Sequence, residues 1–375
     1  MTVADRGRVG WRTVLPPWAV AKALGLLVPL LTVWQGSAAR GLPSSAEFRQ
    51  AFDWWDAPIY LSIADHGYPS SVNGADAHLW GFLPGFPMLL HAATVVIRDQ
   101  IVAGVLVNGV LELVALLLIA RLVAAELDGD AGRFAAWVVA LWPLAFFLTA
   151  IYTESAFLCC AAGSLLLARR GDLGRASLIA AIGCAVRVTG IALVPALLIE
   201  YVRRHGRRPR PVLAAVLLVP LPLLLFALYG HTHAGDLLAY REGQSRLGAS
   251  FGLPWDGARA TWDAVVLTTL PASTAYVFLL ELCFGIAGLV ALVVAAVQRA
   301  LAPSLWAYCA GVWLLAVSLS FWRSVPRYEL AMFPLVIVLA RWTRGRAAVR
   351  AALLTASAGL LAYGASRYAV DLWLG

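Results

Sequence analysis

Charged residues are scarce in this sequence. Asp, Glu, Lys and Arg make up 13% of the 375 residues, whereas apolar residues make up 61%. Soluble globular domains average roughly 25% charged and 45–50% apolar residues. No polar stretch is long enough to fold alone, so all the long apolar segments belong to one bundle. The sequence therefore predicts an all-α, polytopic integral membrane protein, with residues 1–375 in a single transmembrane domain.

Cysteine is also sparse, and its positions argue against two kinds of site. All five cysteines lie inside apolar segments, at Cys159, Cys160, Cys184, Cys283 and Cys309. Such residues behave as small buried hydrophobes, so we expect neither a disulfide framework nor a zinc site. The histidine spacing gives no strong metal motif. Nothing in the sequence demands a metal or a cofactor.

The positive charge is concentrated in short linkers. The formal net charge is +8, and the arginines cluster at 169–170, 203–210 and 341–350. Clusters of this kind between apolar spans set membrane orientation by the positive-inside rule. Membrane orientation thus explains the charge, and we expect no nucleic-acid partner. The basic start at 1–12 precedes an apolar run too long for a signal-peptide core, which favours an uncleaved first helix.

Nine apolar segments approach the roughly 20 residues that a spanning helix needs. They are 17–34, 101–121, 134–149, 152–168, 211–229, 274–297, 303–321, 328–343 and 347–368. The run 82–97 either crosses fully or dips in and returns. The run 176–201 lies between two basic linkers, and two half-length helices meeting near Arg187 would return the chain to the same side. We therefore predict about 9–11 transmembrane helices.

This scheme places four segments outside when the N-terminus is inside. They are a first outer loop at 35–81, a tip at 150–154, a second large loop at 230–272 and a short segment at 322–327. Almost every unusual polar residue falls in them, and apart from Arg187 the predicted spans are nearly free of charge. We therefore expect the chemistry at the outer face.

The first outer loop predicts two short helices. Ser44 and Glu47 have capping-box spacing ahead of an amphipathic stretch, which suits a helix along the membrane surface. Pro58 interrupts this helix, and a second one should end at Gly67. Asp56 falls at the junction between the two helices, in the stretch FDWWDAPIYLSIADHGY.

Asp56 has two interpretations. It could be an N-cap of the second helix, a routine role for aspartate. Alternatively, its neighbours Trp55, Tyr60 and His66 suggest a substrate site, where a partly desolvated carboxylate has a raised pKa and can act as a general base. Asp53 is either a solvated loop charge or a reserve base.

Five stretches in order carry a resemblance to a known family. They are WWDAPIYLSIADHGY at 54–68, GFLPGFP at 81–87, LWPLAFFLTAIYTESAF at 141–157, AVRVTGIAL at 185–193 and VPRYELAMFPLVIVLA at 325–340. The chain resembles the second mannosyltransferase of glycosylphosphatidylinositol (GPI) assembly, the PIG-V family, and its bacterial relatives. These belong to the GT-C glycosyltransferases, polytopic enzymes that take sugar from a polyprenyl phosphate.

The resemblance implies an inverting transfer of mannose from polyprenyl-phosphate-mannose to a glycolipid or glycan hydroxyl, at the extracytoplasmic face of the cell membrane. The family's catalytic carboxylate lies in its first outer loop, and its tryptophan–aspartate pair maps to Trp55 and Asp56. The family usually has a basic residue before this pair, where the chain has Trp54. If that basic residue contacts phosphate, another residue must replace it here.

Arg187 and Arg327 are the best candidates for the phosphate, because guanidinium groups bind phosphate in a bidentate manner. Arg187 could instead form a structural ion pair, and Arg327, like its neighbour Arg323, could be an interfacial anchor. Tyr152 and Glu154 lie at the tip 150–154, and both are candidate substrate-binding residues. Glu154 could orient the acceptor, pair with an arginine, or be a solvated acid. His66 and His78 could bind sugar or phosphate, although lone loop histidines usually do neither.

Two features remain open at this level. The loop 230–272, with Arg241, Gln244, Arg246 and Trp255, either covers the active site or is a plain amphipathic linker. The alternative function is a lipid-linked sugar flippase or secondary transporter, which should place polar groups near the midplane and at both faces. A non-catalytic scaffold subunit is a third interpretation, against which the retained aspartate argues.

Overall fold

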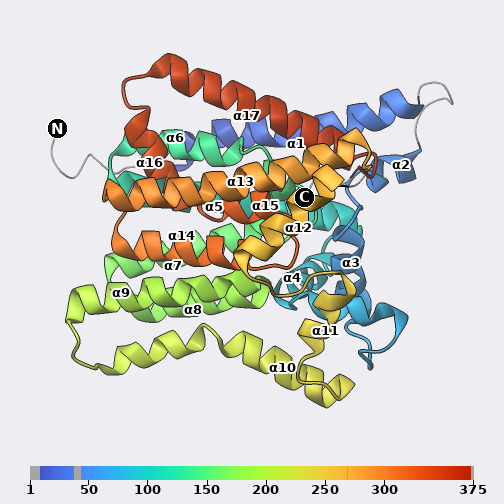
Figure 1. Cartoon of the computed structure of the whole chain (residues 1–375), viewed down its shortest axis with the longest axis horizontal. Coiled ribbons are helices and arrows are strands. Elements are labelled where there is room, and N and C mark those ends of the chain that lie inside the picture. The colour runs from blue at the N-terminus through green and yellow to red at the C-terminus, as the bar shows by residue number, and fades with distance from the viewer. Residues whose placement is uncertain (1–8, 38–43, 268, 373–375) are drawn as a thin grey trace.

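The computed structural model describes residues 9–37, 44–267 and 269–372, and helices dominate these ranges (Figure 1). The only β-type pairing among the described residues is an isolated antiparallel bridge between Phe251 and Leu319. The predicted all-helical class is therefore confirmed. Backbone polar groups cannot be left unsatisfied in lipid, which is why a chain this apolar folds into helices.

Within these described ranges, four helices are long and apolar enough to cross a membrane. They are α1 (Trp11–Ser37), α5 (Gln100–Glu126), α13 (Ala272–Val297) and α17 (Ala347–Tyr368). They match the predicted spans at 17–34, 101–121, 274–297 and 347–368. A further apolar pair, η5 (Pro211–Leu218) and α10 (Leu221–Ala234), is bent by 46° where Pro220 interrupts the helix, and it forms either a broken span or a re-entrant loop.

The other predicted spans are shorter or broken. The segment 134–149 divides around Pro143 into α6 (Gly129–Ala140) and η3 (Ala145–Leu148). The segment 328–343 divides around Pro334 into α15 (Val325–Leu330), η6 (Phe333–Leu335) and α16 (Val336–Trp342). Proline removes a helix hydrogen bond at each break. The two remaining predicted spans, 152–168 and 303–321, correspond to α7 (Glu154–Arg170), which begins after the tip 150–154, and α14 (Pro303–Val317). Nine to eleven crossings therefore remain a prediction.

The segment 176–201 folds as the sequence suggested. α8 (Leu173–Val186) ends at Arg187, whose backbone is extended, and η4 (Val188–Ala192) and α9 (Leu193–His205) follow. Arg169, just before α8, pairs with Glu200 near the end of α9 at 3.0 Å. The α8–α9 segment is thus a hairpin whose tip is Arg187 and whose two basic linkers lie at the same end.

The arginine-rich linkers at 169–172, 200–204 and 341–350 gather at one end of the bundle, together with their acidic partners at 126–130. We call this end the basic end. Arg344 pairs with Asp128 at 2.6 Å, and Arg350 pairs with Asp130 at 2.7 Å. The opposite end, which we call the site end, carries most of the short helices (Figure 1). These are α2 (Ser45–Gln50), α3 (Ala57–His66), η2 (Ala75–Gly81), α4 (Gly85–Thr94), α11 (Ala239–Arg246) and α12 (Pro254–Leu267).

α4 resolves the alternatives for 82–97. With 10 residues it is about 15 Å long, half of the roughly 30 Å hydrocarbon core. The chain therefore returns without a full crossing.

The bundle interior is mostly apolar, and one of its charged clusters lies between α1 and α5. Lys22 pairs with Glu112 and donates to the Thr149 hydroxyl at 2.6 Å. On α5, Asn108 donates to the backbone carbonyls of Ala150 and Tyr152. The predicted spans are therefore less free of charge than expected, and this cluster fixes the tip 150–154. The cysteines are free, and the expected burial is wrong for Cys283, which is exposed on α13.

Candidate functional site

Asp56 lies at the junction of two short helices, as predicted. The Ser44–Glu47 capping box is present at the start of α2, and α3 ends at Gly67. Between them, Trp55 adopts a left-handed backbone conformation with φ 60°, which is costly for a bulky residue. Asp56 occupies the N-cap position of α3, but its side chain makes no capping hydrogen bond. The capping interpretation of this carboxylate is therefore wrong.

The Asp56 carboxylate instead faces a guanidinium group. Its Oδ2 accepts from both terminal nitrogens of Arg327, at 3.3 Å and 3.4 Å. The Asp56 side chain is 31% exposed to solvent, whereas the Arg327 side chain is 10% exposed. The carboxylate is therefore paired yet still open to an incoming molecule.

Two tyrosine hydroxyls hold the backbone around Asp56. The Asp56 N–H donates to the Tyr152 hydroxyl at 3.1 Å. The Tyr368 hydroxyl donates to the Trp54 carbonyl at 2.8 Å, and Tyr152 donates to the same carbonyl at 3.3 Å. The tip 150–154 and α17 thus fix the position of the first outer loop.

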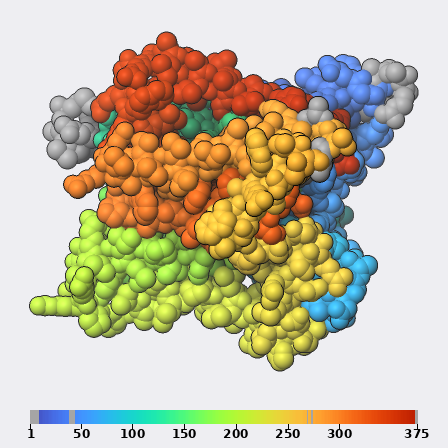
Figure 2. All heavy atoms as spheres, in the orientation of Figure 1, coloured from blue at the N-terminus to red at the C-terminus, as the bar shows by residue number. Residues whose placement is uncertain are grey.

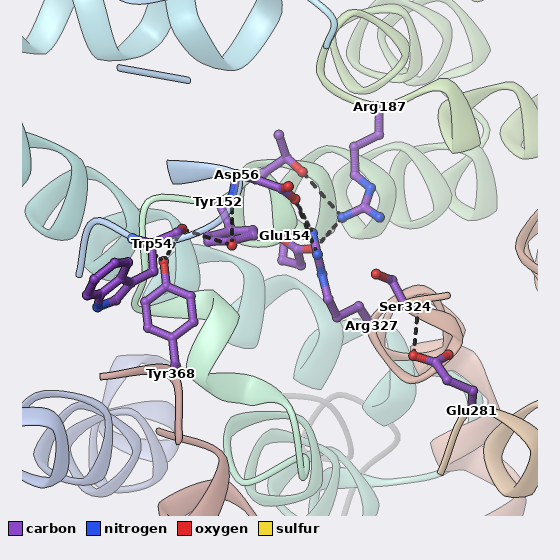
Figure 3. Close-up of polar contacts among 10 residues, drawn as sticks. Trp54, Asp56, Tyr152, Glu154, Arg187, Glu281, Ser324, Arg327 and Tyr368 are labelled. Atoms are coloured by element: carbon purple, nitrogen blue, oxygen red, sulfur yellow. Dashed lines mark hydrogen bonds and ion pairs between the residues drawn. The ribbon is translucent and has the colours of Figure 1, made fainter. Parts of the chain in front are cut away.

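Glu154 joins the two candidate arginines. Its Oε1 accepts from Arg187 at 2.5 Å and from the Nε of Arg327 at 3.0 Å. The Glu154 residue is 3% exposed, so the interpretation of a solvated loop acid is wrong. Figure 3 shows Asp56, Glu154, Arg187 and Arg327 converging from four separate segments.

Aromatic rings support both guanidinium groups. The Arg327 guanidinium lies 4.5 Å from the ring centre of Phe147 and 4.8 Å from that of Tyr152. Arg187 lies 4.9 Å from the ring centre of Tyr328. Cation–π contacts of this kind favour a charged arginine in a partly desolvated place. Both arginines are therefore fixed in direction before any ligand binds.

A cavity of about 590 Å³ opens beside these groups. This volume lies within the roughly 300–1,000 Å³ that is usual for small-molecule sites. Asp56, Arg187 and Arg327 line it, together with Trp55 and Tyr152. Arg323 is a third arginine on its wall. The cavity therefore presents one carboxylate and three guanidinium groups, a combination suited to an anionic ligand that also has a hydroxyl group to deprotonate.

Burial changes the acidity of the loop groups in the direction that the sequence suggested. It raises the pKa of the Asp56 carboxyl above its usual range, and the positive charge of Arg327 opposes this shift. Burial also raises the pKa of the Tyr60 phenol. Tyr60 packs edge-on against Tyr152, with ring centres 6.2 Å apart, so it lies directly behind the cavity and supports its wall.

Three predicted residues lie away from the cavity wall. His66 is exposed at the end of α3, His78 is partly buried on η2, and Asp53 is partly buried beside Trp54. None of the three lines the cavity. The Trp54 indole points away from Asp56, beside Tyr368 (Figure 3), so it does not take the place of the family's basic residue.

The second large loop covers part of the cavity. Tyr240 and Gln244 of α11 line it, and Gln244 donates to the Gly81 carbonyl. Figure 2 shows the yellow α11 and α12 on the surface beside the blue first outer loop. The covering interpretation is therefore correct for α11. Arg246 pairs with Glu242, and Trp255 is exposed, so neither residue contributes to the wall.

Several wall residues escaped the sequence analysis. Tyr240, Ser324, Tyr328 and Tyr368 all line the cavity. Tyr328 follows Arg327 within a stretch that carries the family resemblance, which was an available signal. Tyr240 and Tyr368 lie outside the five stretches that carry the resemblance, and only the folded chain brings them to the site.

The positive charges described at the cavity belong to arginines. Within residues 9–37, 44–267 and 269–372, no group of three or more His, Cys, Asp or Glu side chains is placed to hold a metal ion. Both acids of the cluster are paired with guanidinium groups. A phosphate would therefore meet arginine side chains here.

No protein-family model and no curated protein matches this chain. Solved structures of the oligosaccharyltransferase of Archaeoglobus fulgidus are similar in fold. The complex with Zn and sulfate has a TM-score of 0.51 at 13% identity, and the match covers 94% of this chain and 53% of that chain. The form tethered with an acceptor peptide containing the NVT sequon has a TM-score of 0.52 at 13% identity, covering 96% and 55%.

The chain spans about half the length of these structures. At this identity the likeness concerns the fold alone, and that fold is GT-C, the fold of polytopic membrane glycosyltransferases. The predicted fold class is therefore confirmed. The closer resemblance to the PIG-V mannosyltransferases remains a prediction.

Proposed function

We propose that this chain is an inverting glycosyltransferase that moves mannose from polyprenyl-phosphate-mannose to a hydroxyl of a glycolipid or glycan, at the extracytoplasmic face. The observation that carries the proposal is the accessible Asp56 carboxylate beside fixed arginines in one cavity of a GT-C bundle. The sugar identity rests on the five sequence stretches that resemble the PIG-V family.

Asp56 would act as the general base. It accepts the proton of the acceptor hydroxyl while the hydroxyl oxygen attacks the anomeric carbon of mannose. The bond from that carbon to the phosphate oxygen breaks, and polyprenyl phosphate departs as a dianion. A β-linked donor then gives an α-mannoside. A correctly placed base contributes roughly 10²–10⁴-fold to such a step.

Arg187 and Arg327 would stabilise the departing phosphate. Fixed positive groups that face developing charge lower the barrier without reorganising during the reaction. Glu154 holds both guanidinium groups through one oxygen, so its role would be to orient them. Trp55, Tyr152 and Tyr60 would shape the sugar site.

A flippase or transporter would need polar groups along the path between the two faces. The charged cluster inside the bundle, Lys22 with Glu112, is instead paired within itself and bonded to the tip 150–154. The carboxylate and arginines that face the cavity all lie at the site end. This one-sided arrangement favours the enzyme.

The test is mannose transfer from radiolabelled polyprenyl-phosphate-mannose in membranes that contain the full chain. Asp56→Asn should lower transfer by about 10²–10⁴-fold, because it removes the base. The matched control is Asp53→Asn, an acid three residues away that does not line the cavity, and it should keep near-normal activity. Full activity of Asp56→Asn would exclude Asp56 as the base. Absence of transfer by the wild type would exclude the mannose donor.

A further inference from the structure

A buried acid on α13 contacts the segment that carries Arg327. Glu281 is 0% exposed, and each of its carboxyl oxygens accepts one backbone N–H. Oε1 accepts from Ser324 at 2.8 Å, and Oε2 accepts from Val325 at 2.6 Å. Figure 3 shows this contact on the opposite side of Arg327 from Asp56. Glu281 does not line the cavity, so its contact with the site is indirect.

The turn that Glu281 contacts is unfavourable by itself. Ser324 has φ 63° and ψ 18°, the left-handed region that residues other than glycine avoid. The first N–H groups of a helix lack acceptors within the helix. At the start of α15, the Glu281 carboxyl oxygens accept from two such N–H groups. A strained turn of this kind persists only when its surroundings hold it.

This turn sets the direction of two arginines. The Arg327 N–H donates to the Ser324 carbonyl at 3.0 Å, so Arg327 lies one turn after the strained residue. Arg323 immediately precedes Ser324 and also lines the cavity. A change in the backbone at 324 would therefore move the guanidinium groups on both sides of it.

We propose that Glu281 is a positioning residue for the anionic donor: its two hydrogen bonds hold the turn at 324–325 so that Arg323 and Arg327 face the cavity. The proposal deepens the proposed function and rests on it, because it assigns these arginines to a phosphate. It adds a membrane-embedded acid on α13 to the residues that determine donor affinity.

The chain offers a matched control in Glu329. This acid is also buried, at 7% exposure, and lies on α15 two residues after Arg327. It lines a separate, mostly apolar cavity of about 220 Å³ among α6, α13 and α16. Glu329→Gln therefore changes a buried acid on the same short helix and leaves the turn at 324–325 intact.

The experiment measures initial transfer rates of the full chain in membranes while polyprenyl-phosphate-mannose is varied. Glu281→Ala should raise the KM for the donor by about 10- to 100-fold, the range expected when a charge-assisted hydrogen bond is lost. Glu281→Gln should fall between wild type and Glu281→Ala, because its amide oxygen can still accept one N–H. Glu329→Gln should stay within about twofold of wild type, because this side chain lines the second cavity and not the one beside Arg327.

A second readout does not depend on sugar transfer. Hydrogen exchange at Ser324 and Val325 should become at least about tenfold faster in Glu281→Ala, since both amides lose their acceptor. Ser324→Gly in the Glu281→Ala background should recover part of the donor affinity, because glycine adopts this backbone conformation without strain. If Glu281→Ala does not fold, Glu281→Gln provides the test.

The outcomes separate the two proposals. If hydrogen exchange at Ser324 and Val325 is faster in Glu281→Ala but the wild type transfers no mannose, the role of Glu281 in the turn is retained and the mannosyl donor is rejected. An unchanged KM in Glu281→Gln and Glu281→Ala, with fewer active molecules and a lower Tm, would show a purely structural residue and overturn the positioning role. Unchanged exchange at 324–325 would overturn it as well.

Discussion

Arg327 contacts two acids unequally, and this inequality separates their roles. Its Nε and a terminal nitrogen each lie 3.0 Å from Glu154, whereas its contacts with Asp56 are 3.3 Å and 3.4 Å. Arg187 is the second guanidinium group that pairs with Glu154, and its ion pair is with Glu154 rather than with Asp56. Glu154 is therefore the fixed counter-ion of the arginines, and Asp56 remains the acid with room to accept a proton.

The pH dependence of transfer should follow Asp56. The base must be ionised to act, and burial raises its pKa in the folded chain. Transfer should therefore decline as the pH falls, with a midpoint above the ordinary aspartate value of about 3.9. A pH profile of kcat/KM checks this, and a midpoint at or below that value would contradict the assignment.

The same shift predicts the effect of Asp56 on stability. A raised carboxyl pKa means that the folded state binds the proton more tightly than the unfolded state does. Protonated Asp56 therefore contributes to stability at low pH, and this contribution is lost as the pH rises through the pKa of the folded state. At neutral pH the ionised Asp56 therefore does not add to stability through its own titration. Asp56→Asn should accordingly lose transfer without a lower Tm, a result that also identifies the variant as folded.

Sequence reasoning located the acid and the two arginines, but it did not determine how they contact one another. The stretch around Asp56 and the two arginine-bearing stretches were readable because polar residues are rare beside apolar spans. Pairing of Glu154 with an arginine was one of the interpretations that the sequence offered, and it is confirmed. That both arginines share this acid was not readable, because the contacts join residues 33 and 173 positions apart. Glu281 was missed for the same reason: its partners are backbone N–H groups more than 40 positions away.

At the scale of elements, broken helices determine the site. Arg187 lies where α8 ends, Arg327 lies on the short α15, and Glu154 begins α7 after an irregular tip. Continuous helices would have pointed these side chains along the bundle wall. The break near Arg187 was predictable from the two flanking basic linkers, whereas the divisions at Pro143 and Pro334 were not recognised in the apolar pattern.

The Arg187 break depends on one glycine. Gly190 donates its N–H to the Arg187 carbonyl at 2.9 Å, and a Cβ at 190 would lie 2.6 Å from the Cys184 Cα in α8. Gly190→Ala must push η4 away from α8, and overpacking of this kind costs about 1–3 kcal/mol. We expect transfer to fall by about 10- to 100-fold, because displacement of a positioned group by ~1 Å can have this effect.

Gly174→Ala is the control for this prediction. Gly174 lies in the first turn of α8, and a Cβ there would meet nothing within 4 Å. Alanine favours a helix over glycine by up to about 1 kcal/mol, so this variant should keep its activity and its Tm. Equal transfer by the Gly190→Ala and Gly174→Ala variants would show that the exact position of the break is unimportant.

At the scale of the whole molecule, charge divides the two ends. The basic end joins its arginines to Glu126, Asp128, Asp130 and Glu200, and the site end holds the cavity. From the positive-inside rule we predict that the basic end faces the cytoplasm. The site end would then face the extracytoplasmic side, as a donor delivered on that leaflet requires.

This orientation can be tested by cysteine labelling in sealed cells. Ser70→Cys places a thiol on an exposed residue of the site end, and Arg207→Cys places one in the exposed linker after α9. A membrane-impermeant maleimide should label position 70 from outside, and position 207 only after permeabilisation. The unsubstituted chain is the control, because its five cysteines lie within helices.

The two positions also test the axis of the bundle. Labelling of 207 from outside, with 70 protected, would reverse the orientation and require a donor on the cytoplasmic leaflet. Labelling of both from outside would mean that the two ends do not lie on opposite faces, which contradicts the assignment of α1, α5, α13 and α17 as spanning helices. Because an inverted chain would still place Asp56 beside Arg327 in one cavity, the labelling decides where transfer occurs independently of whether Asp56 is the base.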